Sequence, residues 1–380
     1  MPSKEVGQVE PDKKVDSVCP YCGVGCLLTY NIKDDKILFA EGRDGPANMS
    51  RLCVKGRYGF NYVNSDQRLT VPLARKKGVS KDINPEEFDL DKIENYFEPI
   101  SWDEAIKRTT EKFKSLVMDD SRSTAGFGCA KGSNEEAYLF QKLVRTGFRN
   151  NNVDHCTRLC HASSVVALLE MIGSGAVSNQ VADVAEAETI IVIGANPTVN
   201  HPVAATFIKN AAKAGKNLIV LDPRKNDLAR HATHYLQFKP DTDVALLNAI
   251  MKSIIDQNLI DEKFINERTT DFDDLKSHLN DFTPEKMSSI CGIDAGVINE
   301  VARIYASSSA SIIFWGMGVS QHIHGTDNAR ALISLALMTG QVGRPGTGLH
   351  PLRGQNNVQG ASDSGLIPMV YPDYQRVDNP

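Results

Sequence analysis

A doubly wound α/β fold behind a small metal-binding domain is the architecture that this sequence predicts. Three observations support it. Four cysteines lie within 35 residues near the N-terminus. From about Asp183 onward, short β-branched runs alternate with helical segments, as in a parallel sheet covered by helices on both faces. The 380 residues are 41% apolar and 23% charged, an ordinary globular composition, and the length allows two or three cores.

Charge and hydropathy exclude several classes of protein. The net charge is -5 and no basic stripe stands out, which argues against nucleic acid as a partner. No run of 18 apolar residues exists, so we expect no membrane span. Residues 1–17 carry no apolar export segment and no twin-arginine pair, which predicts a cytoplasmic protein. In that compartment eight cysteines suit metal binding better than disulfides.

The chain divides into five predicted segments. Residues 1–17 are expected to be a disordered or extended leader. Residues 18–62 form a short domain rich in Gly and Cys, with two strand-like pieces. The next segments are the first part of an α/β domain, then a ligand-binding α/β domain, then the start of a further region: 63–155, 156–355 and 356–380.

Cap and strand signals place the elements in order. Ser101 and Glu104 form a predicted capping box ahead of apolar residues at helical spacing. The polar stretch 78–97 before it is expected to be a surface loop. Further along, the pattern predicts strands at 189–194, 217–222, 234–238 and 311–316, and helices at 201–214, from about 241, near 293–307 and from about 325 to 338.

The cysteine spacing is that of an iron–sulfur site. Cys19, Cys22 and Cys26 follow a Cys-x2-Cys-x3-Cys pattern, and Cys53 comes after 26 further residues. Three thiolates on one tight loop, closed by a distant fourth, suit the corners of a [4Fe–4S] cube. Structural zinc usually has a second Cys-x2-Cys pair, which is missing; zinc and unmetallated cysteines remain the alternatives. Lys55 is either a surface lysine or a cation between this cluster and a second redox centre.

Small turn residues with a polar group follow the predicted strands. In doubly wound sheets, ligands bind at the carboxyl ends of the strands. Such turns can hold a phosphate, a ribose or a base edge, although any single one could be an ordinary turn. No GxGxxG follows a strand, so a simple NAD-binding domain is not supported. Four such turns on one sheet favour a nucleotide-like cofactor, at 194–197, 222–224, 240–243 and 316–318.

Cys160 stands next to His161, with Arg158 two residues before the cysteine. A thiol near positive charge has a lowered pKa and can act as a thiolate ligand or nucleophile. A neighbouring histidine can move a proton near neutral pH. The alternative for Cys160 is a buried structural cysteine, which is what we expect for Cys129, Cys156 and Cys291.

A late polar loop begins at Arg353 and continues with Gln355 and Asn356. Runs of Asn, Gln and Gly are usually plain loops. An arginine in such a loop could also hold a small carboxylate through two N–H groups.

Together these segments resemble a known family. They are similar to the alpha subunit of molybdenum- or tungsten-dependent formate dehydrogenases, which are bis-molybdopterin guanine dinucleotide oxidoreductases. The resemblance extends from Val18 to the end of the chain. Its motifs are Cys-Pro-Tyr-Cys-Gly-Val-Gly-Cys at 19–26, Cys-Val-Lys-Gly at 53–56, Arg-Leu-Cys-His at 158–161, Asp-Pro-Arg at 222–224 and Arg-Gly-Gln-Asn-Asn at 353–357.

The resemblance implies four catalytic residues. Cys160 would bind the molybdenum or tungsten, and His161 would accept or relay the proton from formate. Arg353 would hold the formate carboxylate, and Lys55 would lie between the pterin and a [4Fe–4S] cluster. The ligands of that cluster would be Cys19, Cys22, Cys26 and Cys53.

It also implies a set of residues that bind molybdopterin guanine dinucleotide. The familiar version of one loop has a glycine where this chain has Asp241, a departure that weakens the assignment of that loop. The implied cofactor-binding residues are Lys131, Asn134, Gly194, Asn196, Pro197, Asp222, Pro223, Arg224, Asp243, Gly316, Met317, Gly318, Gln321, Gln355 and Asn356.

The implied function is oxidation of formate to CO2, with electrons leaving through the cluster to electron-accepting subunits of iron–sulfur or flavin type, some of them NAD-linked. A nitrate reductase of the same fold and a non-catalytic iron–sulfur electron-transfer scaffold are the alternatives. Family members continue for several hundred residues and add a C-terminal β-barrel. We therefore expect this chain to be an N-terminal portion or a truncated product.

Overall fold

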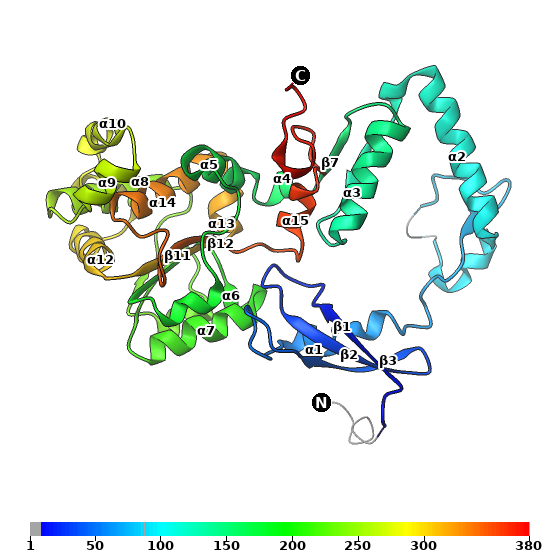
Figure 1. Cartoon of the computed structure of the whole chain (residues 1–380), viewed down its shortest axis with the longest axis horizontal. Coiled ribbons are helices and arrows are strands. Elements are labelled where there is room, and N and C mark those ends of the chain that lie inside the picture. The colour runs from blue at the N-terminus through cyan, green and yellow to red at the C-terminus, as the bar shows by residue number, and fades with distance from the viewer. Residues whose placement is uncertain (1–8, 85, 87, 380) are drawn as a thin grey trace.

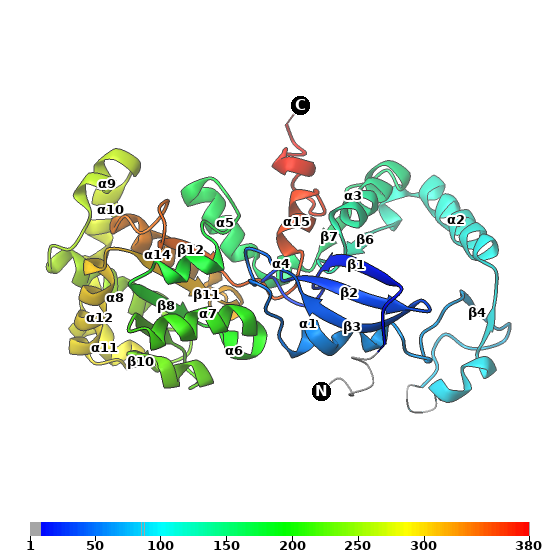
Figure 2. The same cartoon turned by 60° about the horizontal axis from the view of Figure 1, so that its bottom comes forward.

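Three parts lie side by side in the computed structural model, which describes residues 9–84, 86 and 88–379 (Figure 1). A domain with a parallel sheet stands on one side, and a lobe containing helices α2 and α3 stands on the other. The N-terminal sheet, drawn in blue, lies between them, and the turned view keeps the same order (Figure 2).

The N-terminal domain is an antiparallel sheet of β1 (Lys13–Val18), β2 (Leu27–Lys33) and β3 (Lys36–Gly42), followed by helix α1 (Val54–Tyr58). The two strands expected after the cysteine loop are confirmed. β1 begins inside the segment expected to be a leader, because backbone pairing with β2 holds this polar strand. Of that leader, residues 1–8 lie outside the described residues.

The main sheet of the described chain has the strand order β10-β9-β8-β11-β12, and all of its pairs are parallel. The chain order reverses between β8 and β11, which is where doubly wound sheets bind their ligands. The four predicted strands are confirmed, and β12 was not anticipated. The strands are β8 (Thr189–Ile193), β9 (Asn217–Leu221), β10 (His234–Leu236), β11 (Ser311–Trp315) and β12 (Gly348–Pro351).

Alternate side chains of these strands enter two hydrophobic cores. Ile191 and Ile313 contribute to the larger core, which includes helices α5, α8, α12 and α14, whereas Ile190 and Ile312 contribute to a smaller core with α7. Helices on both faces confirm the doubly wound class. Among the described helices none is long and apolar enough to cross a membrane. The helices of this domain are α4 (Thr157–Cys160), α5 (Ala162–Ile172), α6 (Pro197–Asn200), α7 (Pro202–Lys213), α8 (Asp243–Asp256), α9 (Glu262–Arg268), α10 (Phe272–His278), α11 (Pro284–Cys291), α12 (Ala295–Ser307), α13 (Met317–Ser320) and α14 (Gly325–Met338).

The lobe beside the N-terminal domain is built around α2 (Trp102–Asp119) and α3 (Asn134–Lys142). The Ser101 hydroxyl oxygen accepts the Glu104 N–H at 3.2 Å, so the predicted helix start is confirmed. The predicted capping box is only half formed, because the Glu104 carboxylate accepts from Arg108 at 2.7 Å instead of from the Ser101 N–H. None of the described side chains of α2 is buried. The lobe's short strand pairs are β4 (Leu73–Arg75) with β5 (Phe97–Pro99), antiparallel, and β6 (Gly126–Gly128) with β7 (Val153–His155), parallel.

The last helix, α15 (Val358–Asp363), packs against α3 (Figure 1). The Arg145 guanidinium donates to three backbone carbonyls beyond it, those of Gly365, Ile367 and Val370. Residues 356–379 are thereby joined to the lobe. The remaining short helical turns span Gly59–Tyr62, Leu90–Asn95, Ser121–Ser123, Leu143–Gly147, Val181–Ala185, Asp227–His231, Leu279–Asp281 and Pro372–Tyr374.

Candidate functional site

Four thiols line one small cavity between the N-terminal sheet and the start of α7. Cys19, Cys22 and Cys26 lie on the loop that joins β1 to β2, and Cys53 directly precedes α1. The Cys19 N–H donates to the Cys26 carbonyl at 2.9 Å, which closes the loop. We call these four residues the cysteine cage. The other walls of its cavity are Tyr21, Leu52, Gly56, Pro202 and Val203.

The chemistry of the cysteine cage fits an iron–sulfur cluster. Burial raises the pKa of Cys19, Cys22 and Cys26, that of Cys26 to about 12, and repulsion between neighbouring thiolates adds to the effect. Iron removes this cost because it binds thiolates directly. No three His, Cys, Asp or Glu side chains of the described residues are spaced to hold a single metal ion.

Two lysines connect the cysteine cage to its surroundings. Lys55 Nζ donates to the Val199 carbonyl in α6 at 3.2 Å. Lys131 Nζ donates to the carbonyls of Pro20 and Tyr21, at 3.2 and 3.3 Å, within the cysteine loop. Burial raises the pKa of Cys22, and both ammonium groups oppose that rise. Lys55 thus spans from the cage toward the loop after β8, and Lys131 spans from the cage toward the lobe.

The loops after β8 and β11 touch at two glycines. The Gly318 N–H donates to the Gly194 carbonyl at 3.0 Å. A Cβ on Gly318 would lie 2.6 Å from that oxygen, and Gly194 has a φ of 56° with no room for a side chain. The close contact of the two loops therefore requires glycine at both positions. Beside them lie four more of the implied cofactor-binding residues, Asn196, Pro197, Gly316 and Met317.

Asp222 follows β9 and is fixed by its own turn. Its Oδ1 accepts the Arg224 N–H at 2.8 Å, and the Asn226 side-chain amide approaches Oδ2 at 3.5 Å. Burial raises the pKa of Asp222. Pro223 lies half-buried between them, whereas the Arg224 side chain is exposed. This turn therefore presents a preorganised carboxylate next to a solvent-facing guanidinium.

Asp243 begins α8 and is 2% exposed. Its Oδ1 has no hydrogen-bond partner within the described residues, and burial raises its pKa to about 6. A buried carboxylate oxygen without a donor fits a base edge that offers N–H groups, as guanine does. Asp241, the departure from the family pattern, has a φ of 65°, the left-handed conformation that glycine adopts readily. The loop therefore keeps a glycine-like path.

Cys160 ends α4 and faces α13 at the end of β11. Its Sγ lies 3.6 Å from the sulfur of Met317, a residue 157 positions away in the sequence. The Gln321 side-chain amide donates to the Leu159 carbonyl. The fold thus brings the candidate metal ligand to the carboxyl ends of the parallel strands, where the glycine loops lie. We call this end of the main sheet the sheet edge.

The expected lowering of the Cys160 pKa by Arg158 is wrong. Burial raises the pKa of Cys160, and the groups that oppose this rise are the Gly354 N–H and Arg353. Arg158 turns away instead, toward the Met369 sulfur at 2.6 Å and Asp154 at 3.8 Å. The arginine whose charge favours the Cys160 thiolate is therefore Arg353 and not Arg158.

His161 is fully buried and both of its ring nitrogens are engaged. Nδ1 lies 3.1 Å from Ser320 Oγ, and Nε2 lies 3.1 Å from the Leu352 carbonyl. Burial lowers its pKa to about 3, and the Arg353 charge adds to the effect. The neutral ring joins α4 to α13 and β12. A proton relay through His161 would have to pass by way of the Ser320 hydroxyl.

Arg353 follows β12 and is 7% exposed. Its Nη2 donates to the Gly175 carbonyl at 2.9 Å, and its Nη1 has no partner among the residues that the structure describes. Burial lowers its pKa to about 10, which leaves the guanidinium charged at neutral pH, and nearby Cys160 acts in the opposite direction. A buried cation with an unused N–H next to Cys160 is a site for a small anion.

Gln355 and Asn356 lie in a loop that packs on residues 130–134. Cys156 Sγ donates to Gln355 Oε1 at 2.7 Å, and the Asn356 amide approaches the Lys131 carbonyl at 3.5 Å. Asn134 accepts a hydrogen bond from Asn357. The side-chain amide oxygen of Asn356, Oδ1, is buried and accepts no hydrogen bond within the described chain. The loop at 130–134 and the loop at 353–357, which the sequence suggested separately as cofactor-binding, are therefore in contact with each other.

Only one of the three cysteines expected to be buried and structural is buried. Cys291 lies in the core, Cys156 is half-buried against Gln355, and Cys129 is exposed. Cys129 follows the short edge strand β6, where neighbouring side chains do not cover it.

Two residues of the site were missed. His201, at the start of α7, donates from Nε2 to the Arg353 carbonyl at 2.7 Å. Ser320 contacts His161 and Ser164. His201 could have been found because a histidine directly follows the loop after a predicted strand, whereas Ser320 carries no signal in the sequence.

Two protein-family models match the chain. The Molybdopterin oxidoreductase Fe4S4 domain matches residues 12–65, which contain the cysteine cage, and Molybdopterin oxidoreductase matches residues 68–375, which contain the sheet edge. The chain belongs to the molybdopterin oxidoreductase family. These matches support the predicted [4Fe–4S] cluster and molybdopterin cofactor.

Several relatives of this chain carry formate dehydrogenase names. F420-dependent formate dehydrogenase 2 subunit alpha of Methanococcus maripaludis is 40% identical over 366 residues, 96% of this chain and 51% of its own length. F420-dependent formate dehydrogenase subunit alpha of Methanocaldococcus jannaschii is 40% identical over 97% of this chain and 52% of its own. Formate dehydrogenase H of Escherichia coli is 38% identical over 97% and 50%. The chain spans about half the length of these relatives.

A solved structure with the same fold is Acetylene Hydratase from Pelobacter acetylenicus. Its TM-score is 0.75 at 22% identity, and the match covers 88% of this chain and 44% of the hydratase. This likeness supports the fold of the family.

Proposed function

We propose that this chain is the catalytic-subunit portion of a formate dehydrogenase, which converts formate to CO2, one proton and two electrons. The observation that carries the proposal is Arg353. Its buried guanidinium keeps one nitrogen without a partner in the described chain and lies close enough to Cys160 for their charges to interact. A carboxylate of one carbon is an anion small enough for such an enclosed site. The formate dehydrogenase names of the relatives support the same substrate.

Each residue of the site has a separate proposed role in binding the cofactor, binding formate or moving the proton. Cys160 would bind the molybdenum or tungsten, and the sheet-edge loops with Asp222 and Asp243 would hold one pterin dinucleotide. When bound, the metal–pterin group supplies two-electron redox chemistry. Arg353 orients the formate carboxylate and compensates its charge in a site with little water. His161 keeps Ser320 in place to move the released proton.

The cysteine cage would hold the iron–sulfur cluster, which supplies one-electron chemistry when bound. Lys55 supports this role because it extends from the start of α1, next to Cys53, to the Val199 carbonyl in α6. A cation there favours the added negative charge of a reduced cluster. The partners are electron-accepting subunits of iron–sulfur or flavin type.

The alternatives are less well supported. A nitrate reductase would bind an anion of the same charge, yet the relatives reported above are formate dehydrogenases. A scaffold without catalysis would not require a buried, partly unsatisfied arginine close to a cysteine at the sheet edge.

The test is formate binding and turnover by the chain loaded with its cluster and metal–pterin group. Formate should reduce a viologen dye, and Arg353→Gln should raise the KM for formate by about 100-fold, since a charge-assisted pair contributes about 2–3 kcal/mol. Line broadening of 13C-formate in NMR gives a readout that does not need turnover, and it should vanish in the same variant. Arg303→Gln, an exposed arginine on α12, is the matched control. Dye oxidation by nitrate without any response to formate would overturn the proposal.

A further inference from the structure

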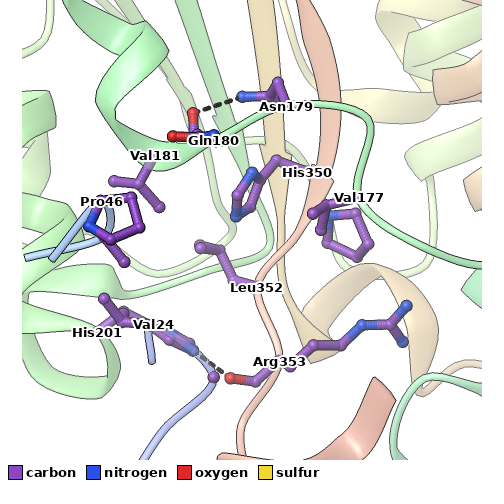
Figure 3. Close-up of a pocket in the computed structure, with 13 residues that line it drawn as sticks. Val24, Pro46, Val177, Asn179, Gln180, Val181, His201, His350, Leu352 and Arg353 are labelled. Carbon is purple, nitrogen blue, oxygen red and sulfur yellow. Dashed lines mark hydrogen bonds between the residues drawn. The ribbon is translucent and has the colours of Figure 1, made fainter. Parts of the chain in front are cut away.

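The main-chain carbonyl of Arg353 is held by two hydrogen bonds, and both donors directly adjoin in sequence residues that line the cavity of the cysteine cage. The Gly23 N–H donates to it at 3.1 Å, and His201 Nε2 donates at 2.7 Å (Figure 3). Gly23 lies between the cage ligands Cys22 and Cys26. His201 directly precedes Pro202 and Val203, which line the cage cavity. Arg353 is therefore attached to the cage from two independent segments.

Gly23 and Arg353 pack so closely that no side chain fits at position 23. A Cβ on Gly23 would lie 2.6 Å from Arg353 Cβ and 2.7 Å from the Arg353 carbonyl oxygen. The residue before Arg353 is anchored to the sheet, because the Leu352 N–H donates to the Trp315 carbonyl at 2.8 Å. Arg353 thus bridges the rigid sheet and the cysteine loop, and movement of that loop is transmitted to it.

His201 is suited to a fixed role. It is 5% exposed, and burial lowers its pKa, so the ring stays neutral and carries its proton on the nitrogen that donates to Arg353. Its Nδ1 has no partner within the described residues. A cavity of about 290 Å³, lined by Gly23, His201 and Arg353 among others, borders this contact and gives the loop room to relax (Figure 3).

We propose that Gly23 and His201 are positioning residues that couple the cysteine cage to Arg353, so that binding of the iron–sulfur cluster orders the substrate arginine. Without the cluster, the four thiols lose the group that ties them together, and the loop that carries Gly23 loosens. Coupling of this kind is reciprocal, so loosening Arg353 also weakens the hold on the cluster. The inference rests on the proposed function only in naming Arg353 the substrate arginine.

The first test is hydrogen exchange of the full chain with its cluster and after anaerobic removal of iron. The cluster should slow exchange of the amides in residues 352–356 about tenfold. Equal exchange of this segment in both states, while the β2–β3 hairpin responds to iron, would overturn the coupling. The result does not depend on whether Arg353 binds formate, so it is separable from the proposed function.

The second test measures how fast a chelator removes iron from the reconstituted chain. His201→Ala should lose its cluster about three- to tenfold faster than the unaltered chain, because one buried hydrogen bond to Arg353 is missing. His201→Gln keeps an N–H donor and should restore the slow rate. His278→Ala, an exposed histidine on α10, should match the unaltered chain. Equal rates for His201→Ala and His278→Ala would overturn the role of His201.

Discussion

The cysteine cage and the sheet edge both hold ligands, but different forces shape them. The cage is a loop on a small antiparallel sheet, and burial, with a contribution from the neighbouring thiols, raises the pKa of Cys19 and Cys26. The sheet edge is carried by strands such as β8 and β11, whose residues are all buried between two hydrophobic cores. We therefore expect the stability of the cage to depend on a bound cluster, whereas the strands that carry the sheet edge are already packed within the two cores.

This difference shows where unsatisfied groups are tolerated. Asp243 and Asn356 keep buried oxygens without donors in the described chain, which a strong core can support at a cost of about 1–3 kcal/mol each. The cage has no comparable core beneath it, because its cluster of buried apolar residues is small and includes the cysteines themselves. Four experiments test this contrast.

The largest effect is expected in the cage. Cys26→Ser should remove nearly all of the four-iron cluster, because one corner of the cube loses its thiolate. Iron and sulfide analysis with EPR of the reconstituted chain measures this. Cys129→Ser, a substitution at an exposed cysteine outside the cage, should keep the full iron content. If both variants hold the same amount of iron, the cage is not the cluster site.

The next effect concerns the core below the sheet edge. Ile313→Ala should lower the free energy of unfolding by about 2–5 kcal/mol, because Ile313 is fully buried in β11. Ile106→Ala on α2, where the side chain is 59% exposed, should change it by no more than about 0.5 kcal/mol. Urea unfolding followed by tryptophan fluorescence compares the two. Similar losses would mean that the sheet is not the stable part of the chain.

A smaller, pH-dependent effect is expected at Asp243. Its folded pKa of about 6 is above the ordinary value of 3.8, so the folded state favours the protonated form. This contribution is complete below pH 3.8 and is lost as the pH rises through 6, where ionisation destabilises the fold. Asp243→Asn should therefore stabilise the chain at pH 7.5 by about 3 kcal/mol, with the gain vanishing near pH 4. Thermal melts across this range measure it, and a gain that does not change with pH would contradict the buried carboxylate.

The smallest effect is expected at Lys55. Lys55→Met should shift the reduction potential of the cluster to more negative values, by about 1 kcal/mol or roughly 40 mV, because the reduced cluster loses a nearby cation. Lys55→Arg keeps the charge and should keep the potential. A redox titration followed by EPR separates the two. Equal potentials in the methionine and arginine variants would place Lys55 off the electron path.

Local patterns in the sequence predicted much of this molecule. The cysteine spacing, the cap at Ser101 and the β-branched runs of β8, β9, β10 and β11 each depend on neighbouring residues, and each was recognised. β12 was missed because its four residues include Gly348 and Pro351, which weaken any strand signal. The start of β1 was missed because its polar side chains hide a strand that backbone pairing stabilises.

Long-range contacts decided what the local patterns could not. Arg158 is close to Cys160 in sequence, yet the group whose charge acts on the thiol is Arg353, 193 positions further along. His161 is predicted to accept or relay a proton, and only the folded structure shows that it is buried against Ser320 and Leu352. The direction of a side chain depends on which elements pack around it, and adjacency in sequence does not report that.

The sequence by itself determined the family resemblance and the fold class, and it suggested which groups are proposed to bind metal and anion, because these follow from residue type and spacing. Tertiary structure decided how the groups act on one another. In the folded chain Arg158 points away from the Cys160 thiol, toward Met369. One nitrogen of Arg353 has no partner in the described chain. The Arg353 carbonyl accepts hydrogen bonds from Gly23 and His201. Burial and hydrogen-bond pairing depend on residues far apart in the chain, and only the folded chain brings them together.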